Sequence, residues 1–464
     1  MQGGLFIRYI VVIDGEHYPE VTEAALREIA ADHEVLAAVL VGGKEKLPKG
    51  GLDSLEGFDL RTGRDPRRAL EDAIVDLGPD AVLDLSDDPV LDYRKRHELA
   101  AIALFRGIEY HGADFRFTPP PRPRVATRPS VAVIATGKRA GKTAVAGLVA
   151  RHLKSRGVRP IIVAMGRGGP PEPEVMRGDE MELTPEDLLE LVDSGKHGAS
   201  DYIEDALLAQ VPTVGCRRCG GGLAGGVDFS NVAAGVEISN DLPGDIVVLE
   251  GSGASIPPVH ADATILVLPA SLSEEYLVGY MGPYRLLLAD LALITMCEEP
   301  FGSPSHVSTL STRISDAYRS SADGQTNSEG INVVRTVFRP APVRSVEDSD
   351  VFVATTAPEE AADSIRKHLE TEQHCRVVGI THSLSDRDRL ESEIAAIEGR
   401  ADVLLCEIKA AGVDVATRRA IDAGLDVVYM DNEPVGIEDE VIEPEVDRIA
   451  ELAAARFRER EAEP

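Results

Sequence analysis

The sequence predicts an α/β protein in which a central P-loop NTPase domain with a parallel sheet is flanked by N-terminal and C-terminal Rossmann-like α/β domains. Two observations carry this prediction. Short apolar runs alternate with stretches of helical periodicity, which is typical of doubly wound parallel sheets. One of these runs leads through a glycine loop ending in Gly-Lys-Thr (141–143) into a helical stretch, which is the strand, loop and helix order of a P-loop.

The 464 residues are enough for two or three domains. A proline-rich segment, 118–124, suits neither helix nor strand and is expected to be a linker. A stretch rich in serine, threonine and aspartate, 303–330, is expected to be a loop. The predicted domains are an N-terminal α/β domain (1–124), a P-loop ATP-binding catalytic domain (125–330) and a C-terminal α/β domain (331–464).

Periodicity places the elements of each domain in order, because buried parallel strands are continuous apolar runs and helices carry apolar residues at a spacing of three and four. In the N-terminal domain we expect strands 9–13, 35–41, 81–85 and 108–111 and helices 21–31, 66–77 and 91–106. In the central domain we expect strands 131–135, 159–164, 245–250, 263–268 and 291–295, with a helix at 144–153. In the C-terminal domain we expect strands 351–354, 376–380, 403–407 and 426–429 and helices 358–371, 385–397, 414–423 and one after 443.

The composition favours a cytoplasmic protein. No apolar run approaches the length of a membrane span, the start lacks the regions of a signal peptide, and five cysteines are too scattered for a disulfide framework. The net charge of −31 repels nucleic acid and anionic membranes, so neither is expected as a partner. Many acidic residues with few lysines favour a salt-rich cytosol, and a GC-rich genome, which also prefers arginine to lysine, is the alternative.

The P-loop predicts binding of ATP and Mg²⁺. Loop amides and the helix N-terminus face the phosphates, Lys142 reaches the β and γ oxygens, and the Thr143 hydroxyl is expected to hold Mg²⁺. The template asks for glycine at 136, where this chain has Thr136 followed by Gly137. The residues expected to bind the nucleotide are Gly137, Lys138, Arg139, Gly141, Lys142, Thr143 and Ala144.

A second strand is expected to supply a carboxylate. In P-loop proteins a neighbouring strand presents an acid to the Mg²⁺ shell, and Glu250 ends the apolar run 245–250 at the edge where parallel sheets bind ligands. We therefore predict Thr143 and Glu250 as metal ligands. The alternative is that Glu250 only caps the turn before Gly251.

Several further residues are candidates for binding an anionic substrate. Arg167 lies in a glycine loop after a strand, and Arg217 and Arg218 lie in Cys-Arg-Arg-Cys (216–219) beside three glycines. A zinc or redox role for the two cysteines is the alternative, although no second ligand pair follows. The predicted substrate-binding residues are Arg167, His197, Ser200, Arg217, Arg218 and Ser252, and the predicted catalytic residues are Lys138, Lys142, Glu250 and Arg167. Ser200 is alternatively a helix N-cap.

The nucleotide base is expected near the fifth strand of the central domain. Thr295 and Glu298 occupy the place where many P-loop proteins read the base, and we predict them as adenine contacts. The asparagine and lysine of the usual base-reading motif are absent there.

Taken together, these motifs resemble cyclic 2,3-diphosphoglycerate synthetases. The resemblance extends over nearly the whole chain and accounts for the Thr136-Gly137 departure, because the family shares that loop form. The matching segments are 136–144, 165–170, 197–202, 216–222, 249–253, 295–300, 407–414 and 429–434. More distantly, the central domain resembles dethiobiotin and cobyrinic-acid synthetases.

The resemblance implies an ATP-dependent ligase that closes 2,3-diphosphoglycerate into a ring through an intramolecular phosphoanhydride and releases ADP and phosphate. The product is a compatible solute in some archaea, which agrees with a salt-rich cytosol. Two alternatives stay open: another P-loop ligase that activates a carboxylate, and a nucleotide-regulated binding protein without ligase activity. A homodimer is a candidate assembly.

The excess of 79 acidic over 48 basic residues generates a prediction about salt. Self-repulsion destabilises the folded chain where the Debye length is about 10 Å, at 0.1 M salt, and is screened where it is about 3 Å, at 1 M. Melting temperature and activity are expected to rise between roughly 0.1 M and more than 1 M KCl. A melting temperature that stays constant over that range, measured by scanning calorimetry, would count against a salt-adapted protein.

Overall fold

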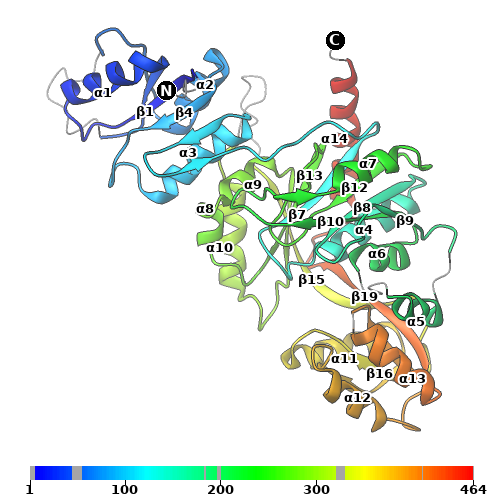
Figure 1. The fold of residues 1–464 in the computed structure, drawn as a ribbon. Helices are drawn as coiled ribbons and strands as arrows, with labels where there is room; N and C mark the ends of the chain where they lie inside the picture. The colour runs from blue at the N-terminus through cyan, green and yellow to red at the C-terminus, as the bar shows by residue number, and fades with distance from the viewer. Residues whose placement is uncertain are drawn as a thin grey trace.

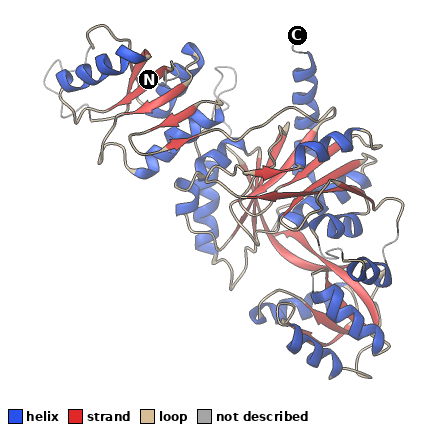
Figure 2. Cartoon of the chain, in the orientation of Figure 1, coloured by secondary structure: helices blue, strands red, loops and turns tan. Residues whose placement is uncertain are grey.

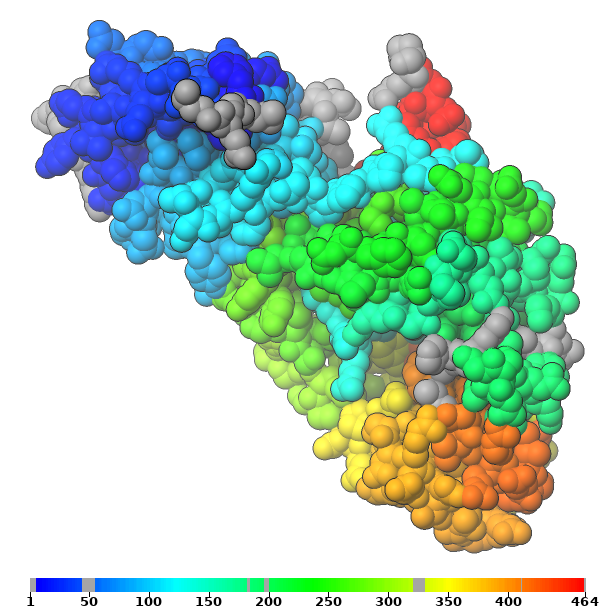
Figure 3. Space-filling view, in the orientation of Figure 1, coloured from blue at the N-terminus to red at the C-terminus, as the bar shows by residue number. Residues whose placement is uncertain are grey.

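The computed structural model describes residues 6–43, 55–181, 184–195, 200–319, 330–409 and 411–462. Two sheets organise the chain, a six-stranded sheet near the N-terminus and a thirteen-stranded sheet that contains all later strands. The N-terminal sheet and its helices form a lobe that stands apart from the rest of the molecule, as the ribbon and the space-filling view show (Figure 1, Figure 3). Mixed, largely parallel α/β architecture, as predicted, is confirmed.

The N-terminal sheet has the strand order β3-β2-β1-β4-β5-β6, parallel except for β6. Its connections through helices place every loop after a parallel strand at one edge. The strands are β1 (Arg8–Ile13), β2 (Glu34–Leu40), β3 (Leu60–Thr62), β4 (Ala81–Asp84), β5 (Glu109–His111) and β6 (Arg116–Phe117), and the helices are α1 (Pro19–Asp32), α2 (Pro66–Leu77) and α3 (Tyr93–Phe105).

The central part of the large sheet has the order β11-β10-β8-β12-β7-β13-β14, with β9 antiparallel to β10. Its strands are β7 (Ser130–Ala135), β8 (Pro160–Gly166), β9 (Glu174–Arg177), β10 (Pro212–Cys219), β11 (Phe229–Ser230), β12 (Ile246–Glu250), β13 (Ala263–Pro269) and β14 (Leu291–Thr295). The helices are α4 (Lys142–Ser155), α5 (Pro185–Asp193), α6 (Asp201–Ala209), α7 (Val232–Asn240), α8 (Glu275–Val278), α9 (Gly282–Leu288) and α10 (Pro304–Ser315).

The C-terminal strands continue the same sheet rather than starting another. The long strand β15 (Asn332–Pro342) pairs in parallel with β14 through its first half and antiparallel with β19 (Asp426–Gly436) through its second half. Beyond β19 the order is β18 (Val403–Glu407), β16 (Asp350–Ala354) and β17 (Arg376–Thr381), all parallel to one another. The helices are α11 (Ala362–Glu372), α12 (Arg387–Ala395), α13 (Arg418–Asp422) and α14 (Glu443–Ala462).

Helices cover both faces of the large sheet, so that its strands are buried on both sides (Figure 2). One face packs against α7, α9 and α10, and the other packs against α4, α6 and α14. Two-sided burial explains why most of these strands are continuous apolar runs that were recognisable in the sequence, whereas β9, β10, β11 and β15 were not predicted. Among the described residues, no helix is both long enough and apolar enough to cross a bilayer.

The expectation of a loop over 303–330 is wrong for its first part. Residues 304–315 form α10, where the Ser303 side chain accepts a hydrogen bond from the His306 amide and Pro304 occupies the first turn. Val307, Leu310 and Ile314 are buried at helical spacing. The helix was missed because serine and threonine occupy its other face and lower its overall hydrophobicity. Residues 320–329 lie outside the described part of the chain.

Ion pairs join the C-terminal strands to the helices around the P-loop. The Lys409 ammonium, just beyond β18, donates to both carboxylate oxygens of Glu204 on α6 at 2.9 and 3.0 Å. Arg151 on α4 pairs with Asp431 on β19 at 2.8 Å. Burial raises the pKa of Glu204 to about 7, because Lys409 offsets only part of the cost of a buried carboxylate.

Lys409→Ala is expected to destabilise the protein by about 2 kcal/mol at pH 8, because it leaves the Glu204 carboxylate buried without its partner. The Glu204 pKa is about 7 in the folded chain and near 4.5 when unperturbed. Below pH 7 the Glu204 carboxylate of the folded protein therefore becomes protonated. The ion pair with Lys409 then weakens in the parent protein as well. The loss is therefore expected to be smaller at pH 5.5, as measured by urea unfolding. Lys154→Ala, which removes a surface lysine bonded to the Gln210 carbonyl, is the control. Equal losses for Lys409→Ala at both pH values would contradict this account.

Candidate active site

The P-loop lies at the carboxyl edge of the large sheet, between β7 and α4. Gly141 has a φ of +90° and directly precedes the helix. A Cβ on Gly141 would lie 2.2 Å from the ring of Phe338 on β15, so the loop has no room for another residue there. Beneath the loop, the buried Thr295 hydroxyl donates to the Ala140 carbonyl at 2.9 Å. The loop conformation is therefore fixed by packing from two neighbouring strands.

Lys142 and Thr143 open α4 at the positions that the P-loop predicts. Lys142 is 8% exposed, and its ammonium lies 3.3 Å from the Gly137 carbonyl, folded back across the loop. Burial lowers the pKa of Lys142, and the nearby Glu250 and Asp201 carboxylates act in the opposite direction. The ammonium thus stands over the hollow of the loop, where it can meet a phosphate.

Glu250 ends β12, the strand next to β7, as predicted. Its Oε1 accepts a hydrogen bond of 2.6 Å from the Thr143 hydroxyl, and its carboxyl group also lies within hydrogen-bonding reach of Asp205. Burial raises the pKa of Glu250 to about 8, with a further contribution from Asp201. A turn cap would direct its oxygens to backbone amides, whereas Glu250 faces Thr143 on the P-loop helix.

Asp205 on α6 is a member of this cluster that the sequence did not indicate. It is 1% exposed, and its carboxyl group lies within hydrogen-bonding reach of the Glu250 carboxyl group. Burial and the neighbouring Glu250 carboxylate raise its pKa well above the ordinary value. Two buried carboxyl groups in contact with each other beside a threonine hydroxyl form a donor set of the kind that Mg²⁺ prefers. The only advance signal was the spacing of Asp201 and Asp205 on one face of a helix.

A cavity of about 570 Å³ opens over these residues. It collects predicted residues from the P-loop, from the loop after β8 and from the end of β12. The predicted residues that line it are Lys138, Arg139, Lys142, Thr143, Arg167, Ser200, Glu250 and Ser252. Asp201 also lines it, and Arg387 and Asp414 line it from the C-terminal part of the chain, which the sequence did not associate with the P-loop.

The side chains of the two arginines of Cys-Arg-Arg-Cys diverge, because they are neighbours on β10 and a strand directs successive side chains to opposite faces. Arg218 donates to the Ser252 carbonyl at 2.8 Å. A Cβ on Gly253 would lie within 3.7 Å of Arg218, Arg167 and Lys138, so these three cations converge there. Arg217 instead has its guanidinium 5.6 Å from the centre of the Phe229 ring.

The two cysteines of this segment also diverge. Cys216 is buried against Gly235 of α7, and burial raises the pKa of its thiol to about 12, while Cys219 is exposed. No cluster of three histidine, cysteine or acidic side chains with the geometry of a metal site occurs among the described residues. The arrangement gives no support to the zinc or redox alternative.

Glu298, Thr295 and Ala144 do not line this cavity. Glu298 forms a two-pronged ion pair with Arg339 at 2.6 and 2.8 Å. The Thr295 side chain is fully buried under the P-loop. Ala144 lies on the first turn of α4, and His197 falls outside the described residues.

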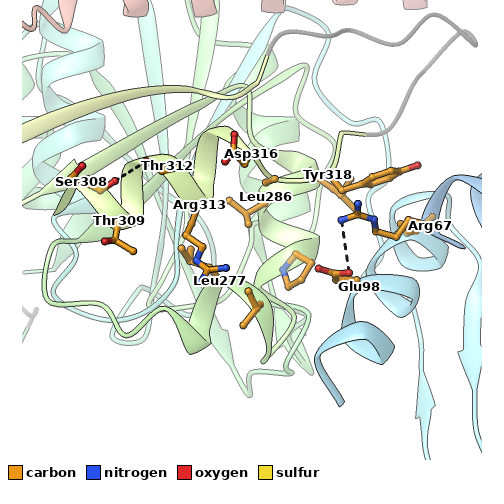
Figure 4. Close-up of a pocket in the computed structure, with 15 residues that line it drawn as sticks. Arg67, Glu98, Leu277, Leu286, Ser308, Thr309, Thr312, Arg313, Asp316 and Tyr318 are labelled. Carbon is orange, nitrogen blue, oxygen red and sulfur yellow. Dashed lines mark hydrogen bonds and ion pairs between the residues drawn. The ribbon is translucent and has the colours of Figure 1, made fainter. Parts of the chain in front are cut away.

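Another cavity, of about 520 Å³, lies between the N-terminal lobe and α8–α10 (Figure 4). Its lining includes Leu277 and Leu286, the hydroxyl face of α10, and the pair formed by Arg67 and Glu98 at 3.9 Å. It contains none of the residues predicted from the sequence. The cavity over the P-loop is therefore the one of these two that gathers the predicted residues.

Comparison with known proteins identifies three successive matches. Family models described as the N-terminal, P-loop and C-terminal domains of cyclic 2,3-diphosphoglycerate synthetase match residues 8–118, 130–323 and 342–433. The chain is 43% identical to the cyclic 2,3-diphosphoglycerate synthetase of Methanothermobacter thermautotrophicus, with 97% of each chain covered. The chain is 43% identical to the cyclic 2,3-diphosphoglycerate synthetase of Methanothermus fervidus, with 97% of this chain and 98% of the relative covered. It is 44% identical to the cyclic 2,3-diphosphoglycerate synthetase of Rubrobacter xylanophilus, with 92% of this chain and 94% of the relative covered.

Proposed function

The chain belongs to the cyclic 2,3-diphosphoglycerate synthetase family, and we propose that it closes 2,3-diphosphoglycerate into a ring at the P-loop cavity, at the expense of ATP and in the cytoplasm. The observation that carries this proposal is the convergence of Lys138, Arg167 and Arg218 beside Lys142 in a chain whose net charge is −31. Ring closure brings two phosphate dianions together, and only a local excess of cations offsets their repulsion.

The proposed reaction has two steps. An oxygen of one substrate phosphate attacks the γ-phosphorus of ATP in line, the bond to the β-phosphate oxygen breaks, and ADP leaves. An oxygen of the other substrate phosphate then attacks the phosphorus of the first, the newly formed anhydride bond breaks, and inorganic phosphate leaves. Phosphates are already ionised at neutral pH, so the site needs to position the groups and neutralise charge rather than supply a strong base.

Each cluster of residues has a proposed role in this reaction. Lys142 neutralises charge on the β and γ phosphates, while Lys138, Arg167 and Arg218 hold the acid substrate. Thr143, Glu250 and Asp205 would hold Mg²⁺, which supplies charge neutralisation at the phosphate oxygens. The hydrogen bond from Thr143 to Glu250 and the contact of Glu250 with Asp205 bring these oxygens together and support that assignment. Glu298 remains the proposed contact for the adenine, and Thr295 is proposed to support the P-loop from below.

We also propose that 1–124, 125–330 and 331–464 are the structural units of the chain, with Rossmann-like first and last units. The N-terminal strand order, in which β1 lies between β2 and β4, supports the first. A carboxylate-activating ligase is the second candidate, but the cavity presents charged groups rather than an apolar or amine-binding wall.

Lys142→Ala is expected to abolish ring formation, because it removes the charge that meets the β and γ phosphates. Its fold should remain, since the side chain lines a cavity and does not fill the core. Phosphorus NMR of the products formed from Mg-ATP and 2,3-diphosphoglycerate measures the effect, and circular dichroism checks the fold. Ring formation at the parental rate would refute the P-loop assignment.

Arg218→Ala is expected to raise the KM for 2,3-diphosphoglycerate more than the KM for ATP. One lost charge-assisted hydrogen bond costs about 1.5–3 kcal/mol, or roughly a tenfold to hundredfold change. Arg217→Ala is the matched control from the next position of the same strand, since that guanidinium lies over Phe229. Steady-state kinetics with each substrate varied in turn provides the comparison. Equal effects of the two substitutions would contradict the assignment of Arg218 to the substrate.

A further inference from the structure

The C-terminal part of the chain contributes a cation to the wall of the P-loop cavity. Arg387 is the first residue of α12, and Asp414 lies in the helical turn after β18. Both line the cavity that contains Lys142 and Arg167. Among the described lining residues, Arg387 is the cation that comes from outside the central part of the sheet.

Arg387 is held at the cavity by an ion pair. Its guanidinium donates to Asp414 Oδ2 at 2.6 Å, while Asp414 Oδ1 is buried and has no hydrogen-bond partner among the described residues. The Arg387 side chain is 56% exposed, and ion pairs of that exposure contribute little to folding stability. The ion pair between Arg387 and Asp414 therefore contributes little to folding stability. Its main effect is to restrict the orientation of the Arg387 guanidinium.

The other cations of the site lie on a different wall. Lys138, Arg167 and Arg218 gather around Gly253, and Lys142 stands over the P-loop. The acceptor phosphate must approach the γ-phosphorus from the side away from ADP, and the second substrate phosphate must be held near the first. A substrate with two phosphates therefore gains from cations on two walls, and the planar fork of arginine suits a phosphate.

We propose that Arg387 binds a phosphate of the acid substrate from the C-terminal wall, and that this contact selects a substrate carrying two phosphates. The inference deepens the proposed function and rests on it. Arg387 has no role toward the nucleotide, which the P-loop and the loop after β14 hold. Asp414 acts as a positioning residue, because it orients the guanidinium before the substrate arrives.

The test compares Arg387→Ala with Arg389→Ala. Arg389 lies on the same helix, two residues further on, and its guanidinium bonds Glu393 at 2.8 Å on the exposed side. Arg387→Ala is expected to raise the KM for 2,3-diphosphoglycerate by about tenfold or more and to leave the KM for ATP within about twofold. Arg389→Ala is expected to match the parent protein. Arg387→Lys should recover part of the loss, because it keeps the charge but not the fork.

Calorimetric titration of 2,3-diphosphoglycerate into the parent protein and the three variants accompanies the kinetics. An unchanged dissociation constant for Arg387→Ala, or an equal rise in the KM for ATP, would overturn the role of Arg387. If the parent protein forms no cyclic product, the proposed function fails. Binding that is weaker in Arg387→Ala but not in Arg389→Ala would then still support Arg387 as a residue that binds a bisphosphate.

Discussion

A chain with a net charge of −31 can hold a polyanion only where its cations gather and its nearby carboxylates are compensated. The carboxyl edge around β7 and β12 meets both conditions. Lys142 is buried beside Glu250 and Asp201, and its positive charge offsets part of the cost of burying these two carboxyl groups, which repel each other when ionised. Arg167, Arg218 and Lys138 converge a short distance away, around Gly253. The rest of the fold serves to hold these opposite charges in place without a ligand.

Three layers of support surround this charge cluster. Phe338 on β15 and Thr295 on β14 contact the P-loop and fix its conformation. The ion pair between Arg339 and Glu298 stabilises the loop after β14. Lys409 holds α6 in place through its ion pair with Glu204. Most of these contacts come from segments beyond residue 290, far in the sequence from the loop that they support. This explains why motifs near the C-terminus belong to the same site as a P-loop near residue 140.

The sequence was sufficient for most of the strands that are buried on two sides and for the P-loop, because these signals are local, but it did not indicate β10 or β15. Glu250 was also predictable, since the end of an apolar strand identifies the edge where ligands bind. Asp205, Arg387 and Asp414 were not predictable, because their roles depend on tertiary packing between distant segments. The short α10 was missed because its serines and threonines obscured three buried apolar residues. The sequence did not indicate that the Arg217 and Arg218 side chains point to opposite faces, because this follows from the strand β10, which was not predicted.

The shared strands β15 and β19 have a mechanical consequence. Proteins that close over their substrates often do so about a hinge of a few residues in a connecting loop. Here Arg387 on α12 and Lys142 on α4 are carried by helices that pack on one continuous hydrogen-bonded sheet, in which seven positions pair between β15 and β19 and four between β15 and β14. Closure between these walls would have to twist the sheet itself, which is a stiff element. The arrangement of the two walls is thus largely set when the chain folds, and it depends on the pairing of β15 with both of its neighbours.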